Sequence, residues 1–154
     1  MPSISNFVTH RRDGYDIPEG MTLAEMLRRG WPPDRVVRVS WTSDGAAISL
    51  SDDDGLLARV VPGRRFVAVI GRPRPAATQL GLWVIDAAGR RHARVDDTQE
   101  ILGARAKGEF LWFETPVVAA EDRFGVVFQH PDGRQFRLDV DAATGDVLHV
   151  QESR

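Results

Sequence analysis

Histidine and carboxylate side chains are the groups in this sequence most able to do acid–base or metal chemistry, but their spacing is poor for either. The four histidines are His10, His92, His130 and His149. No two of them lie two or four residues apart, as they would in a local zinc site. Four groups on the last predicted strands would have to converge in space to form a site: His130, Asp139, Asp141 and His149. Whether they converge is left open, and we predict no metal site and no cofactor.

A run of three carboxylates, Asp52 to Asp54, is the densest acidic cluster. Ca²⁺ and Mg²⁺ prefer several carboxylate oxygens together. The spacing is wrong for a calcium loop, which needs acidic residues at alternate positions and a glutamate at the twelfth. We therefore interpret Ser51 to Gly55 as a solvated hairpin turn.

Motifs for nucleophilic or phosphoryl chemistry are missing from the sequence. It has no cysteine, no Gly-x-Ser-x-Gly elbow, no phosphate-binding loop and no dinucleotide fingerprint. Paired carboxylates for acid–base work would have to come from Glu109, Glu114, Glu121 or Asp122, and such pairs are common by chance. We assign no catalytic residue and favour a protein that is not an enzyme.

The charge is nearly balanced, with 20 basic and 22 acidic residues and a net charge of −2. Nucleic-acid binding is not expected, because it requires a basic face. All the basic residues except Lys107 are arginine. Several fall in the middle of the chain and would form one basic patch if their hairpins packed together: Arg64, Arg65, Arg72, Arg74, Arg90, Arg91 and Arg94.

Aromatic side chains of the run 110–113 are interpreted first as core, or, if one face of the strand meets solvent, as a surface for a protein partner. In the run 110–113, strict alternation places Phe110 and Trp112 on one face and Leu111 and Phe113 on the other. Protein interfaces use aromatic and arginine side chains as anchors. The predicted partner-binding residues are Trp83, Trp112, Arg72 and Arg74.

The elements that must position these groups are mostly strands. Short apolar runs alternate with polar turns rich in Asp and Gly, such as 43–45, 86–89 and 131–133. Such turns between alternating apolar segments are typical of hairpins. The sequence predicts a mainly β protein of about nine or ten antiparallel strands, arranged as meanders that form a sandwich or partly open barrel.

One short helix is predicted at about 22–29. Thr22 and Glu25 have the spacing of a capping box, and Gly30 with the following prolines ends the helix. Leu23, Met26 and Leu27 give it one apolar face, so we expect it to dock on the sheet.

The domain organisation is expected to be a single domain, 1–154, or two β lobes, 1–70 and 80–154, joined by a Pro/Arg linker at 71–79. The strand at 66–70 is apolar on both faces, which is typical of a strand covered by layers on both sides. Thr98 could begin a short helical turn through 100–106, although Gly103 weakens it. A weak repeat relates 44–60 to 132–150 as two three-stranded meanders.

The N-terminus lacks the pattern of a secretory signal, and no stretch reaches the ~20 apolar residues needed to cross a bilayer. We therefore expect a soluble, cytoplasmic, bacterial protein with no membrane partner. The favoured function is non-catalytic binding to a protein partner, of an immunity or accessory type, or self-association. The alternative is a small-ligand-binding or enzymatic β-barrel that uses carboxylates and histidines from several strands.

Overall fold

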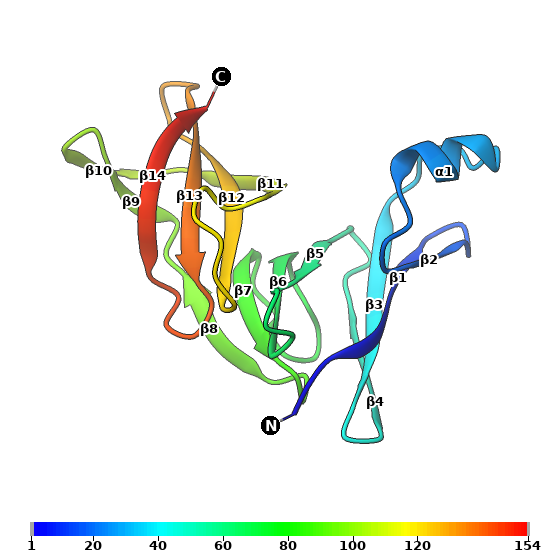
Figure 1. Cartoon of the computed structure of the whole chain (residues 1–154). Helices are drawn as coiled ribbons and strands as arrows, with labels where there is room; N and C mark the ends of the chain where they lie inside the picture. The colour runs from blue at the N-terminus through cyan, green and yellow to red at the C-terminus, as the bar shows by residue number, and fades with distance from the viewer. Residues whose placement is uncertain (1, 154) are drawn as a thin grey trace.

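The computed structural model describes residues 2–153 and confirms a mainly β fold built from antiparallel strands. This part of the chain contains fourteen strands and one helix, α1. The strands form three four-stranded sheets and one separate hairpin. The sheets are open and do not close into a barrel. Figure 1 shows them side by side, with the two outer sheets diverging like the arms of a V from the sheet between them.

The first sheet, called the N-terminal sheet, has the strand order β2-β1-β3-β4. Its strands are β1 (Ser5–Arg11), β2 (Asp16–Pro18), β3 (Val36–Ser43) and β4 (Ala46–Ser51). The middle sheet consists of β5 (Leu57–Val60), β6 (Phe66–Gly71), β7 (Gly81–Asp86) and β8 (Arg91–Val95), in chain order. The C-terminal sheet consists of β11 (Glu109–Glu114), β12 (Arg123–Gln129), β13 (Gln135–Asp141) and β14 (Val147–Ser153), also in chain order.

The middle sheet buries both of its faces, as the apolar pattern of 66–70 predicts. Val67 and Val69 of β6 pack against the N-terminal sheet, in a core that includes Trp41. Phe66 and Ala68 of the same strand pack against the C-terminal sheet, in a second core. Because successive side chains of a strand point to opposite faces, one strand supplies both cores.

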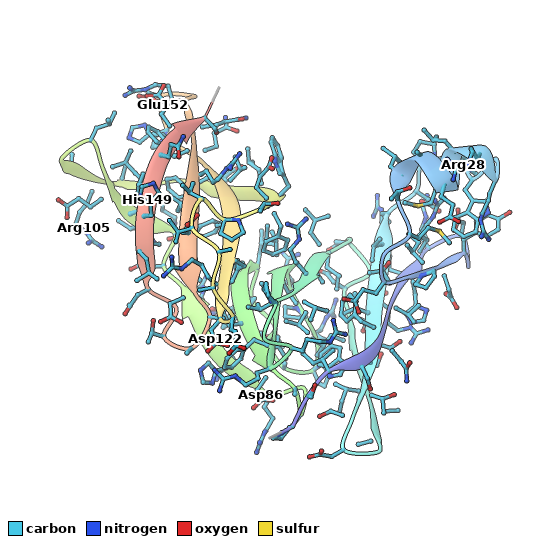
Figure 2. All side chains as sticks on the ribbon, viewed as in Figure 1. Arg28, Asp86, Arg105, Asp122, His149 and Glu152 are labelled. Atoms are coloured by element: carbon cyan, nitrogen blue, oxygen red, sulfur yellow. The ribbon has the colours of Figure 1, made fainter. Side chains whose placement is uncertain are left out.

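The helix α1 (Leu23–Arg28) has the predicted cap, since the Thr22 hydroxyl accepts a hydrogen bond from the Glu25 amide at 3.2 Å. The prediction that it docks on the sheet is wrong. None of its residues is buried, and Leu23 and Leu27 are both more than half exposed. Arg28 marks this helix at the far end of the N-terminal arm in Figure 2. Capping residues fix where a helix begins, but they carry no information about what it packs against.

The segment 98–107 is a hairpin and not a helical turn. It consists of β9 (Thr98–Ile101) and β10 (Ala104–Lys107), paired so that Ile101 lies opposite Ala104. The two residues between them, Leu102 and Gly103, both have positive φ. This is the backbone that a tight two-residue hairpin loop requires, and Gly103 adopts it without steric cost.

The Pro/Arg segment 71–79 connects two neighbouring strands of the same sheet, because β6 pairs with β7 from Phe66 opposite Asp86 to Gly71 opposite Gly81. It is therefore a loop between two strands of the middle sheet, and Arg74 within it forms an isolated bridge with Ser51 of β4. A single domain is the organisation that we retain as a proposal. The two segments of the weak repeat differ in structure. β12, β13 and β14 form one meander, whereas β3 and β4 belong to the N-terminal sheet and β5 to the middle sheet.

Within residues 2–153, no helix has the length and apolar character needed to cross a membrane.

Candidate partner-binding site

The four groups left open as a convergent site do not come together. Asp139 lies directly opposite His149 on neighbouring strands, but its carboxylate is fully buried while His149 is exposed on β14 (Figure 2). Each Asp139 oxygen accepts one backbone amide at 2.9 Å, from Val117 and from Val118. Asp139 therefore holds the loop between β11 and β12 against the C-terminal sheet. Across residues 2–153, no three His, Asp or Glu side chains gather as a metal site would require.

The acidic run at 52–54 is only partly the solvated turn that we expected. Asp54 is exposed, but Asp52 is buried. Asp52 Oδ1 accepts the Asp54 amide at 3.0 Å, and Oδ2 accepts the Arg72 amide at 2.8 Å. A buried carboxylate is tolerated when such donors replace its water. Asp52 thus ties the turn after β4 to the segment that follows β6.

A hydrogen-bonded acid–base–hydroxyl chain, missed in the sequence, crosses the N-terminal sheet. Asp16 Oδ1 lies 2.7 Å from His10 Nδ1, and His10 Nε2 lies 2.6 Å from Ser40 Oγ. The residues lie on β2, β1 and β3, which are adjacent strands, so no local spacing could have revealed the chain. The order of groups is that of a serine hydrolase triad.

The surroundings of Ser40 do not complete such a site. Ser40 lies inside β3, opposite Val8 of β1 on one side and Ser49 of β4 on the other. Backbone N–H groups of a strand paired on both sides are used by the sheet, so they are not free to stabilise an oxyanion. We interpret the chain of hydrogen bonds as a link that joins three strands.

A β-bulge in β11 separates the two aromatic residues that were expected to share a face. Phe110 lies opposite Phe128, but Trp112 lies opposite Val127, so one extra residue is inserted on β11. Phe110 and Phe113 therefore face the core, where they contact the Phe128 and Phe124 rings. Trp112 points away from the core and is 42% exposed. Strict alternation fails here because a bulge reverses the faces beyond it.

Of the predicted partner-binding residues, Trp112, Arg72 and Arg74 are accessible and Trp83 is not. Trp83 is only 4% exposed and packs in the core between the N-terminal and middle sheets. Its indole N–H donates to the Gln79 carbonyl at 2.9 Å, and the Arg94 guanidinium lies 5.2 Å from its ring centroid. This burial does not support a direct role for Trp83 in partner binding.

The central arginines do not form the single basic patch, because most are neutralised by separate carboxylates. Arg72 lies 3.5 Å from Asp54, and Arg74 lies 4.0 Å from Asp52. The other ion pairs of this group are Arg64 with Glu19, Arg65 with Asp122 and Arg90 with Asp86.

Two exposed ion pairs change the pKa of their carboxyl groups. The side-chain hydrogen bonds from Arg134 lower the pKa of Asp132 to about 2. The bidentate pair with Arg64, at 2.8 Å for both bonds, lowers the pKa of Glu19. Arg64 also donates to the Ile4 carbonyl, so this pair fastens the start of the chain to the turn between β5 and β6.

These features define a mainly β protein of three packed antiparallel sheets, in which the buried carboxylates of Asp52 and Asp139 accept backbone amides and the outer surfaces carry exposed apolar side chains. No protein-family model and no curated protein matches the sequence. A chain of the solved structure described as "Structure of Tne2 in complex with Tni2" does match it. The two chains are 34% identical, the match covers 98% of this chain and 99% of that one, and the TM-score is 0.90. This protein therefore belongs to the same family as that chain.

Proposed function

We propose that this protein binds a partner protein in a stable, specific complex, as the immunity-type member of a bacterial two-protein pair. The observation that carries the proposal is the family relationship with a chain solved as part of the Tne2–Tni2 complex. Because nearly the whole of both chains is matched, the surface used for binding in the relative has an equivalent here.

The arrangement of chemical groups supports the immunity role over that of the active member of the pair. Asp52 and Asp139 accept backbone amides, and His10 lies between Asp16 and Ser40. These groups stabilise the fold in their present contacts. A non-catalytic binder, by contrast, needs only a rigid surface with exposed anchors.

The test is co-expression with the product of the adjacent gene, because a neutralising protein must be made whenever its toxin is made. We expect the neighbouring protein to arrest growth when expressed alone, and co-expression of this chain to restore growth. The two proteins should also copurify with one-to-one stoichiometry. Growth arrest by this chain, relieved by its neighbour, would assign it the opposite role in the pair.

A further inference from the structure

A shallow groove crosses the boundary of all three sheets and is lined by exposed apolar side chains. It consists of two adjoining cavities of about 280 and 360 Å³, which share Ile70 and Leu80. Val36 at the start of β3 and Leu57 at the start of β5 line one cavity, and Phe110 of β11 lines the other. We call this surface the three-sheet groove. In Figure 1, β5, β6 and β7 lie between the N-terminal and C-terminal sheets.

The floor of the groove keeps large apolar side chains in contact with solvent. Leu80 is 58% exposed and Leu57 is 43% exposed, although Leu57 belongs to the middle sheet and Leu80 directly precedes its strand β7. Clustered apolar side chains around a concavity, unlike isolated ones, are typical of a binding surface. Such a groove can receive one large apolar side chain of a partner as an anchor.

The charges at the ends of the groove have opposite signs. Asp97 and Glu109 line the end beside the C-terminal sheet, held together because the Gly108 amide donates to the Asp97 carbonyl at 2.9 Å. Arg35 lines the other end, where the adjacent Asp34 carboxylate is already paired with Arg12 at 2.9 Å. Among the ion pairs of residues 2–153, none involves Asp97, Glu109 or Arg35. These three charges are therefore available to a ligand.

We infer that the three-sheet groove binds an extended segment of the partner protein that presents an apolar side chain next to a lysine or arginine. The apolar side chain lies against Leu57, Ile70 and Leu80, and the basic residue lies at Asp97 and Glu109. Complementary charge at the rim steers association and fixes direction, while the buried anchor supplies most of the affinity. This inference rests on the proposed function, because it assigns the surface through which the pair forms.

The test measures the Kd for the copurified neighbouring protein by calorimetry, in the parent and in four single variants. Leu80→Arg and Glu109→Arg change the groove. Leu148→Arg and Asp146→Arg make the same changes on β14 and the turn before it, at exposed positions outside the groove. We expect at least a tenfold weaker Kd for each groove variant and less than a twofold change for each control. Leu80→Ser replaces Leu80→Arg if circular dichroism shows that the latter is not folded.

A second measurement isolates the charge contribution. Raising the salt concentration should weaken binding of the parent more steeply than binding of Glu109→Arg, because screening acts on the ion pair that the variant lacks. Groove variants that bind like the parent would overturn the assignment while leaving the proposed function intact. A parent that binds no neighbouring protein would contradict the proposed function and this inference with it. If the parent self-associates and a groove variant does not, the groove is occupied by a second copy of this chain instead.

Discussion

The backbone amide of Val117 donates to Asp139 Oδ1 at 2.9 Å, beneath a loop that leaves the Asp139 side chain with no exposure to solvent. The amide of Val118 satisfies the other oxygen at the same distance. This carboxylate therefore binds the loop before β12 to the C-terminal sheet through two hydrogen bonds. It is not part of a histidine–carboxylate site.

Asp139→Asn tests the contribution of these two hydrogen bonds to stability. An asparagine amide has only one acceptor oxygen, so its NH₂ group would face a backbone N–H and leave that donor unsatisfied. We expect the free energy of unfolding to fall by about 1–3 kcal/mol. Urea denaturation measures it, and Asp141→Asn is the control, because Asp141 accepts a single amide, from Ala143, near the surface. Equal effects of the two substitutions on the free energy of unfolding would contradict this structural role of Asp139.

The Glu19–Arg64 pair predicts a pH-dependent contribution to stability. The pKa of Glu19 is lowered in the folded protein, from an ordinary value of 4.5. Its contribution is therefore fully present above pH 4.5 and is lost as the pH falls through the lowered value. Because the pair is partly exposed, this contribution is at most about 1 kcal/mol.

Glu19→Gln should accordingly lower the denaturation midpoint at pH 7 and have progressively less effect below pH 4.5. The matched control is Glu100→Gln, at an exposed position on β9. A difference between parent and Glu19→Gln that stays constant from pH 7 to pH 2.5 would show that the ion pair is not its cause.

The bulge in β11 predicts unequal roles for Phe110 and Trp112, which strict alternation would place on the same face. Phe110 packs against the core and contacts the Phe128 ring, so Phe110→Ala should lower the free energy of unfolding by about 1–3 kcal/mol. Trp112→Ala removes a larger side chain but leaves the core intact, and should change stability by about 0.5 kcal/mol or less. Denaturant midpoints of Phe110→Ala and Trp112→Ala test this arrangement, because strict alternation would place both residues on one face and give the two variants similar effects.

The hydrogen-bonded Asp16–His10–Ser40 chain predicts no nucleophilic reactivity at Ser40. Since the amides around Ser40 are used by the sheet, an attacking hydroxyl would have no oxyanion donors. A fluorophosphonate probe should leave Ser40 unmodified by mass spectrometry, with an active serine hydrolase in the same tube as the positive control. Labelling of Ser40 that disappears in His10→Gln would assign a catalytic role instead.

The sequence carried enough information to predict the kind of fold and the central position of β6. The strand at 66–70 has apolar residues on both faces, and an apolar side chain favours a buried position. The sequence pattern therefore predicts directly that both faces of this strand are buried. The cap at Thr22 and the end of the helix near Gly30 also depend only on residues close in sequence, and both predictions were confirmed. The exposure of α1 was not predictable, because it depends on which surface lies nearby in three dimensions.

The candidate sites were harder to predict for the same reason. The bulge in β11 depends on how that strand pairs with β12, and it alone decides that Trp112 points outward and not inward. Trp83 could not be distinguished from Trp112 by residue type, although one is buried and the other exposed. The three-sheet groove is formed by residues from β3, β5, β6 and β11, which no sequence spacing connects.

The middle sheet supplies residues to both cores, and we therefore propose that the chain folds as one unit. The main apolar face of each outer sheet packs against the middle sheet, so a fragment cut before β6 or after β8 would expose much of that face. Neither arm can be exchanged with a relative as a separate module unless the residues of β6 that face it change as well. Val67 and Ala68 are neighbours in sequence yet belong to different cores, so a single-residue insertion between them would place side chains shaped for one interior into the other.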